Sequence, residues 1–282
     1  MAASRRSPNF LFIGPDKSGS TWLYEVLKWH PQVFVSRAKE LFYFDHYFHL
    51  GEDWYLAHFG GATPGHRAVG EISHDYLFSV EAADRIKRLL PGVKLIACPR
   101  EPVERAHSSY LYMRKQGRVR CGFEEAIQTV DELVDHGLYA KHLRPYYERF
   151  GREAVYAPLF DDLKTDSNAF AQDVFGFLGV ERVALAPGLR RPANEASEPR
   201  SFAVAKLARR AGIAARDCGR PEWVTTVKSS RIVQRTLYRN YANGGKPQLD
   251  SSTRERLKDL FKEDVDALSE LIGTDVAARW GY

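Results

Sequence analysis

The sequence predicts an α/β fold in which a parallel sheet carries helices on both faces. Short apolar runs at residues 10–13 and 93–98 have the character of buried strands. A loop of small or polar residues and then a helical pattern follow each run. Short strands that alternate with longer helices are typical of parallel sheets, because a helix usually connects one parallel strand to the next.

The expected elements follow in chain order. The first strand, 10–13, ends at Gly14, and the first helix, 20–29, places Trp22, Leu23, Val26 and Leu27 on one apolar face. Further strands are expected at 68–71, 93–98 and 154–157, and helices at about 81–90, 103–115, 123–133, 139–150 and 168–178. Gly179 is a helix stop, because glycine readily adopts the left-handed conformation that ends a helix.

The C-terminal part is predicted to be helical. Residues 187–200 hold three prolines and little apolar content, which predicts a long loop. Mostly basic helices follow, and residues 251–272 show an apolar stripe at helical spacing, with Asp250 placed to cap the start and Gly273 to end it. We therefore expect a single domain over residues 1–282, with an α/β core at 8–185, a loop at 186–200 and a helical part at 201–282.

Charge and cysteine content narrow the function classes. The 282-residue chain has a formal net charge of +5, which is too weak to indicate a nucleic-acid partner and fits a local basic pocket for a small polyanion. Cys98, Cys121 and Cys218 form neither a disulfide framework nor a CxxC motif, so reduced thiols are expected. The apolar run at 10–14 is too short for a signal peptide or a membrane span. These features predict a cytoplasmic protein, and its oligomeric state stays open.

The loop between the first strand and the first helix is the most informative segment. It runs from Gly14 to Trp22 and contains one lysine and several hydroxyl side chains. Such a loop presents unpaired backbone N–H groups and the positive end of the helix dipole. Gly19 lets the backbone approach an anion closely, and Lys17 adds a mobile cation. The pattern favours a phosphate- or sulfate-binding loop over the alternative, a tight turn with a helix cap.

The Walker A motif fits this loop only in part. Gly14 and Gly19 have the required spacing, but Ser20 stands where the motif places its lysine, and Lys17 lies inside the loop instead. This order resembles the 5′-phosphosulfate loop of sulfotransferases that use 3′-phosphoadenosine 5′-phosphosulfate (PAPS). The usual form is Pro-Lys-Ser/Thr-Gly-Thr/Ser-Thr, and Asp16 here replaces the proline.

The resemblance extends in order from about residue 10 to residue 179. Residues 39–45, Lys-Glu-Leu-Phe-Tyr-Phe-Asp, resemble the Lys-Glu-x-x-Phe-Phe-Asp segment of the heparan-sulfate-type and bacterial branch. Residues 70–77 resemble its Glu-x-Ser/Thr-Pro-x-Tyr segment. Residues 100–110 fill every fixed position of the family's 3′-phosphate pattern, Arg-x-Pro-x-x-Arg-x-x-Ser-x-Tyr. The chain is thus similar to PAPS-dependent sulfotransferases, which implies a P-loop-like parallel sheet.

The resemblance also implies the reaction and the nucleotide contacts. PAPS would be the co-substrate, a hydroxyl of a small molecule or carbohydrate the acceptor, and adenosine 3′,5′-bisphosphate the product. Lys17 would neutralise charge on the oxygen that leaves sulfur, and Arg100 would bind the 3′-phosphate, since arginine contacts phosphate in a bidentate manner. Arg105 is expected to make structural ion pairs instead. The residues assigned to the nucleotide are Lys17, Ser18, Gly19, Ser20, Thr21, Trp22, Arg100, Ser108 and Arg200.

Two residues compete for the role of general base. Glu40 takes the position of the family's catalytic glutamate, and its apolar neighbours in sequence are expected to raise its pKa by desolvation. His74 replaces the family's usual proline, and a neutral imidazole suits proton transfer near pH 7. Glu71 is expected to position other groups. Ile72 stands where many glycosaminoglycan-modifying members have lysine, which argues against a highly anionic polysaccharide acceptor.

The remaining expectations concern the aromatic segment, the later loop and metals. Aromatic residues between 42 and 59 are expected to form mostly core, with some lining the acceptor cleft. Relatives close a basic loop over the nucleotide in the region that here contains Arg190, Arg191, Asn194, Arg200 and Ser201. The sequence contains no HExxH, EF-hand or Cys/His motif, so no metal is expected. Two alternatives stay open, a P-loop kinase that uses ATP and a non-catalytic nucleotide-binding protein.

Overall fold

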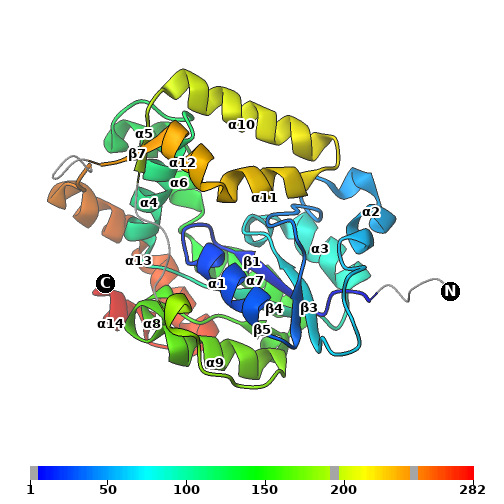
Figure 1. Cartoon of the computed structure of the whole chain (residues 1–282). Coiled ribbons are helices and arrows are strands. Elements are labelled where there is room, and N and C mark those ends of the chain that lie inside the picture. Colours follow the sequence, from blue (N-terminus) through cyan, green and yellow to red (C-terminus); the bar gives the residue numbers. More distant parts are fainter. Residues whose placement is uncertain (1–5, 191–196, 242–246) are drawn as a thin grey trace. The chain divides into compact units, whose positions relative to one another are not determined.

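The structure of the chain is a computed structural model that describes residues 6–190, 197–241 and 247–282. Its backbone forms two compact units, each described separately below (Figure 1). The first unit comprises residues 1–100 and 142–193, and the second comprises residues 101–141 and 194–282. Residues 101–141, which we expected within the α/β core, therefore group with the C-terminal helices. The expectation of a single domain over the whole chain stays a prediction.

The first unit is built on a five-stranded parallel sheet with the strand order β2-β3-β1-β4-β5. The strands are β1 (Phe10–Gly14), β2 (Val33–Val35), β3 (Ala68–Ile72), β4 (Lys94–Ala97) and β5 (Val155–Tyr156). All residues of β1 and β3 are buried, as expected for strands covered on both faces. The predicted α/β class with a parallel sheet is confirmed.

Helices surround this sheet (Figure 1). They are α1 (Ser20–Trp29), α2 (Glu52–Ala57), α3 (Val80–Leu89), α7 (Tyr139–Phe150), α8 (Phe160–Thr165) and α9 (Ser167–Leu178), with short 3₁₀ helices η1 (Phe48–Leu50), η2 (Tyr76–Phe78), η3 (Arg152–Ala154) and η4 (Pro187–Leu189). Trp22, Leu23, Val26 and Leu27 of α1 are buried against the sheet, as the apolar spacing predicted. Helix α9 ends at Gly179 in the left-handed conformation, also as predicted.

Gly70 allows strands β1 and β3 to lie close together. The two strands pair in parallel with Phe10 opposite Gly70, and a Cβ at Gly70 would lie 2.1 Å from the Phe10 carbonyl oxygen. We expect Gly70→Ala to reduce the free energy of unfolding by about 2 kcal/mol, because the backbone must shift to accept the methyl group. Gly92→Ala is the matched control, because a Cβ there meets no atom within 4 Å. Urea unfolding of both variants checks this, and equal stabilities would contradict it.

The second unit is mainly helical. Its elements are α4 (Pro102–Lys115), α5 (Phe123–Thr129), α6 (Glu132–Asp135), β6 (Ser197–Pro199), α10 (Phe202–Asp217), α11 (Pro221–Ser229), α12 (Arg231–Leu237), β7 (Tyr238–Asn240), α13 (Ser251–Ile272) and α14 (Val276–Trp280). Helix α13 has the predicted bounds. The Asp250 carboxylate accepts the N–H groups of Ser252 and Thr253 at its start, and Gly273 ends it at φ 72°.

Several predictions about the second unit are corrected. The helix expected at 123–133 is two helices, because the chain at Val130 takes an extended conformation between α5 and α6. The loop expected at 187–200 contains η4 and also strand β6, which pairs antiparallel with β7. Arg105 is fully buried and donates to the carbonyls of Glu132 and Leu133, and the ion pairs expected of it stay a prediction.

Within residues 6–190, 197–241 and 247–282, no helix combines the length and the apolar character that crossing a membrane requires.

Candidate active site

The loop between β1 and α1 has the backbone geometry of an anion-binding loop. Lys17 and Gly19 both have positive φ, 62° and 83°, and Gly19 precedes the first turn of α1. A Cβ at Gly19 would lie 2.6 Å from a methyl carbon of Leu163 in α8, so a side chain here would combine a rarely adopted backbone angle with a close approach. The first turn of α1 holds no acidic residue. Its N–H groups and dipole therefore favour an anion at this end of the helix.

Trp22, which we assigned to the nucleotide, has a buried side chain. Its side chain is 3% exposed, packs edge-to-face on Phe170 with ring centroids 5.9 Å apart, and donates its indole N–H to the Leu189 carbonyl at 2.6 Å. The indole is thus part of the core. The predicted contact with the nucleotide would involve the backbone of Trp22, and it stays a prediction.

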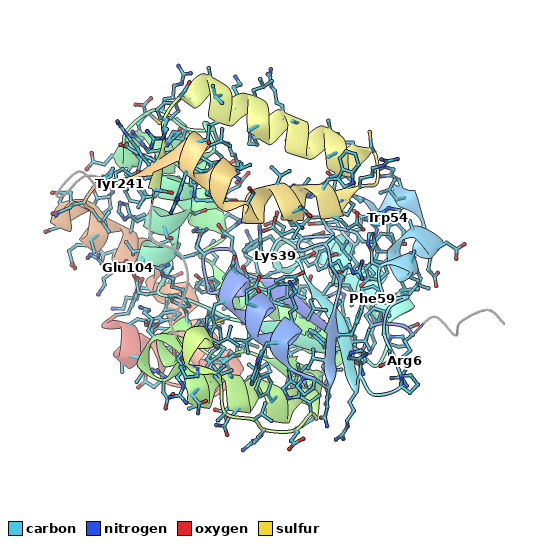
Figure 2. All side chains as sticks on the ribbon, viewed as in Figure 1. Arg6, Lys39, Trp54, Phe59, Glu104 and Tyr241 are labelled. Carbon is cyan, nitrogen blue, oxygen red and sulfur yellow. The ribbon has the colours of Figure 1, made fainter. Side chains whose placement is uncertain are left out.

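Lys39 connects the start of α1 to Glu40. Its Nζ atom lies 3.0 Å from Thr21 Oγ1, 3.3 Å from Ser20 Oγ and 3.4 Å from Glu40 Oε1. Figure 2 labels Lys39 beside helix α1. The side chain is 14% exposed, so its charge lies in a partly desolvated position. We did not assign Lys39 to the site from the sequence. In the sequence, only its position directly before Glu40 pointed to a role in the site. Its contacts with the hydroxyls of Ser20 and Thr21 depend on the fold.

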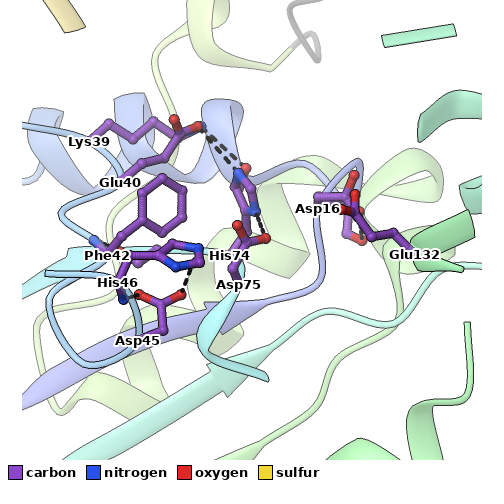
Figure 3. Close-up of polar contacts among 12 residues, drawn as sticks. Asp16, Lys39, Glu40, Phe42, Asp45, His46, His74, Asp75 and Glu132 are labelled. Carbon is purple, nitrogen blue, oxygen red and sulfur yellow. Dashed lines mark hydrogen bonds and ion pairs between the residues drawn. The ribbon is translucent and has the colours of Figure 1, made fainter. Parts of the chain in front are cut away.

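Glu40 and His74, the two predicted bases, are neighbours. His74 Nε2 lies 3.5 Å from Glu40 Oε1, and His74 Nδ1 lies 2.6 Å from Asp75 Oδ1 (Figure 3). Asp75, His74, Glu40 and Lys39 therefore form a line of alternating charge. The Glu40 side chain is 12% exposed, so burial limits its contact with water. Which residue acts as the base stays a prediction.

The surroundings of His74 oppose the expectation of a neutral imidazole, which stays a prediction. Burial of the ring by itself lowers the pKa of His74. The charges of Asp75 and Glu40, and the hydrogen bonds to them, outweigh burial and raise the pKa of His74 well above its usual value. These surroundings favour the protonated ring, which donates a hydrogen bond rather than accepting a proton.

The aromatic segment packs largely as core. Tyr43 and Tyr55 stack with ring centroids 4.4 Å apart, and both are buried, as are Phe44 and Phe59. Burial, together with the nearby Glu71 carboxylate, holds the pKa of Tyr55 well above its usual value. The expectation that most of these rings form core agrees with this packing, whereas an acceptor cleft lined by some of them stays a prediction.

Asp45, His46 and Asp75 are the one group in the described part of the chain that could hold a metal ion, with ligand atoms within 4.8 Å of one another. Within this group Asp45 Oδ2 lies 3.8 Å from His46 Nε2, and Asp75 Oδ1 lies 2.6 Å from His74 Nδ1. We assign no metal to it, and the expected independence of metals stays a prediction.

Arg100, which follows the carboxyl end of β4, contacts the loop between β1 and α1. It donates to the Lys17 carbonyl at 3.0 Å, and its guanidinium lies 5.0 Å from the centroid of the Phe160 ring. This position beside Lys17 agrees with a nucleotide site at the carboxyl edge of the sheet. Arg100 belongs to the first unit, whereas Ser108 lies on α4 in the second. Their joint contact with the 3′-phosphate stays a prediction.

The expected closing loop is described in part. Arg191 and Asn194 lie outside the described residues. Arg190 donates to the Leu185 carbonyl at 3.2 Å, and Ser201 accepts the Val204 N–H as the cap of α10. Arg200 Nε lies 3.1 Å from the Arg235 carbonyl and 3.3 Å from the Tyr238 carbonyl. These three side chains thus have local structural partners, and their contact with a nucleotide stays a prediction.

Comparisons with known proteins identify the type of domain. A family model described as a sulfotransferase domain matches residues 7–268. A crystal structure of a sulfotransferase from Alicyclobacillus acidocaldarius superposes with a TM-score of 0.72 at 24% identity, and the match covers 98% of this chain and all of that one. The similarity in structure shows a shared fold.

Curated relatives are similar over shorter stretches. The membrane-associated sulfotransferase kil1 of Dictyostelium discoideum is 34% identical over 136 residues, which cover 45% of this chain and 29% of that protein. The mouse heparan sulfate glucosamine 3-O-sulfotransferase 3B1 is 30% identical over 191 residues, 64% of this chain and 48% of that protein. The human bifunctional heparan sulfate N-deacetylase/N-sulfotransferase 3 is 31% identical over 198 residues, 62% and 22% respectively. The chain spans less than half the length of each relative.

Proposed function

The chain belongs to the sulfotransferase domain family, and from this premise we propose that it transfers the sulfuryl group of PAPS to a hydroxyl of an acceptor, releasing adenosine 3′,5′-bisphosphate. One observation carries the proposal. Lys39 contacts both the loop hydroxyls of Ser20 and Thr21 and the carboxylate of Glu40. An anion-binding helix start and a candidate general base therefore lie side by side, as in-line transfer to a hydroxyl requires.

The proposed chemistry assigns one role to each group. The acceptor oxygen attacks sulfur, the bond between sulfur and the 5′-phosphate oxygen breaks, and the acceptor proton passes to Glu40. Lys17 stabilises the negative charge that develops on the departing phosphate oxygen, and the N–H groups at the start of α1 hold that phosphate. Protonated His74, anchored by Asp75, donates to Glu40 and fixes the orientation of its carboxylate.

The acceptor class we propose is a hydroxyl of a carbohydrate or of another small molecule. The names of the heparan sulfate relatives support a carbohydrate. Ile72, at the position where many glycosaminoglycan-modifying members carry lysine, is fully buried and provides no cation for an acidic polymer. This favours a less anionic acceptor than heparan sulfate. Family membership favours sulfuryl transfer over the alternative of an ATP-dependent kinase.

Calorimetric titration with adenosine 3′,5′-bisphosphate tests the nucleotide site. We expect wild type to bind, and Arg100→Ala to weaken binding by about 10²-fold or more, because truncating one partner of a buried charge pair costs about 2–5 kcal/mol. Arg88→Ala, which removes an exposed arginine from α3, is the matched control and should bind like wild type. Absence of binding by wild type would overturn the proposed function, and unchanged binding by Arg100→Ala would overturn the 3′-phosphate assignment.

We also propose a reducing, cytoplasmic location. The support is the state of the cysteines, since Cys98, Cys121 and Cys218 are all free thiols. Cys98 is buried, which raises the pKa of its thiol far above the usual value and leaves it unreactive. The chain would thus require no oxidising compartment to fold.

A further inference from the structure

A buried carboxylate joins strand β3 to the segment that carries Glu40. Ser73 Oγ donates to Glu71 Oε2 at 2.7 Å, and the Tyr76 hydroxyl donates to Glu71 Oε1 at 2.9 Å. The same two hydroxyl oxygens accept backbone N–H groups, that of Phe42 at 3.1 Å on Ser73 and that of Tyr43 at 2.9 Å on Tyr76. We call this arrangement the carboxylate clamp. It is fully buried at Glu71, Ser73 and Tyr76.

The clamp depends on the charge of Glu71. A carboxylate only accepts hydrogen bonds, so it takes the proton of both hydroxyls and leaves each hydroxyl oxygen with lone pairs for an N–H group. A protonated carboxyl carries an O–H of its own, so either Ser73 or Tyr76 loses its acceptor and must turn its proton elsewhere. The clamp is therefore complete only when Glu71 is ionised.

The backbone that the clamp holds is in a conformation that non-glycine residues rarely adopt. Glu40 has φ 66° and Phe42 has φ 51°, both in the left-handed region. Such conformations persist only where the surrounding structure enforces them. The Glu40 N–H donates to the Ile72 carbonyl at 2.8 Å, and the clamp accepts the N–H groups of Phe42 and Tyr43. Strand β3 and the residues after it thus determine where the Glu40 carboxylate points.

We propose that Glu71 is a positioning residue whose carboxylate, acting through Ser73 and Tyr76, holds Glu40 in place to receive the acceptor proton. The catalytic part of this proposal rests on the proposed function. The clamp itself is a structural feature that can be tested without any assay of sulfuryl transfer.

The clamp predicts an acid limb in the pH profile of turnover. Burial raises the pKa of Glu71 to about 7, the hydrogen bonds from Ser73 and Tyr76 oppose that shift, and Tyr55 and Asp45 also face the carboxyl. Glu71 is ionised above this pH and gains a proton below it, so kcat should fall about tenfold per pH unit on the acid side. Burial likewise raises the pKa of Asp45 to about 6, so Asp45→Asn is needed to separate the two titrations.

Glu71→Gln is the first test, because it keeps the shape and removes the charge. We expect kcat at pH 8 to fall by about 10²-fold, as for a misplaced catalytic group, with the affinity for adenosine 3′,5′-bisphosphate unchanged. The acid limb near pH 7 should disappear in Glu71→Gln and remain in Asp45→Asn. A limb that persists in Glu71→Gln, or a kcat equal to that of wild type, would overturn the proposal.

Amide hydrogen exchange at Phe42 and Tyr43 tests the clamp independently of activity. After correction for intrinsic rates, protection in wild type should be lower at pH 6 than at pH 8, and in Glu71→Gln it should be low at both. Tyr76→Phe should lower protection at Tyr43. Its matched control is Tyr110→Phe, which removes an equally buried hydroxyl that donates to the Cys121 carbonyl in the second unit. Unchanged protection of Phe42 and Tyr43 in Glu71→Gln would refute the clamp, even if sulfuryl transfer were demonstrated. A wild-type protein that neither binds the nucleotide nor turns over would refute the proposed function and leave the clamp standing.

Discussion

Glu40→Gln should reduce kcat by about 10³-fold while the affinity for adenosine 3′,5′-bisphosphate stays within about twofold of wild type, because general base catalysis contributes about 10²–10⁴-fold. The substitution keeps the side-chain volume and an acceptor oxygen that His74 Nε2 and Lys39 Nζ can still contact. What it removes is the capacity to take a proton from the acceptor hydroxyl. Single-turnover rates with PAPS and calorimetric titration of the nucleotide separate the two effects.

The control for this experiment is Glu25→Gln, which changes an exposed glutamate on α1 and should leave both quantities unchanged. His74→Ala distinguishes the two candidate bases. If His74 orients Glu40, its loss should reduce kcat by about tenfold to 10²-fold, less than the loss of Glu40. A Glu40→Gln enzyme with normal turnover beside an inactive His74→Ala enzyme would transfer the role of base to His74.

Local sequence patterns predicted the elements whose determinants are local. The helix at 20–29 follows from apolar spacing within ten residues, and the caps Gly179, Asp250 and Gly273 are recognised from their own backbone and side-chain chemistry. Strand β2 was missed because three residues show no periodicity, and the six-residue helix α8 was missed for the same reason. Val130 interrupts the helix expected at 123–133, although its apolar spacing continued.

The sequence pointed to individual candidate residues of the site, but not to the contacts between them. The motifs named Lys17, Glu40 and His74, but the contact between Glu40 and His74 depends on the chain pairing at β3, and no local pattern encodes it. The raised pKa of His74 depends on Asp75 and Glu40 together, since burial alone would lower it. The positive φ of Glu40 was also unpredictable, because residue type points to this conformation mainly for glycine and asparagine.

The other large effect concerns the phosphate loop. Lys17→Ala should reduce kcat/KM by about 10³-fold, because removing one group that stabilises developing charge costs about 2.7–4 kcal/mol. The charge in question appears on the phosphate oxygen that leaves sulfur, so the loss should be larger in kcat than in the affinity for adenosine 3′,5′-bisphosphate, in which that bond is already broken. Rates under single-turnover conditions, together with titration of the nucleotide, measure both.

The structure separates this side-chain effect from damage to the loop. Arg100 donates to the Lys17 carbonyl, a backbone atom that Lys17→Ala retains, so this contact with the loop remains in the variant. Lys28→Ala, at an exposed lysine on α1, is the matched control and should behave as wild type. Equal kcat/KM of Lys17→Ala and wild type would contradict the role of Lys17 in transfer, whereas nucleotide binding without turnover by wild type would support a non-catalytic nucleotide-binding protein. A large loss of kcat with nearly intact nucleotide affinity is expected only if the Lys17 ammonium acts on the leaving oxygen during transfer.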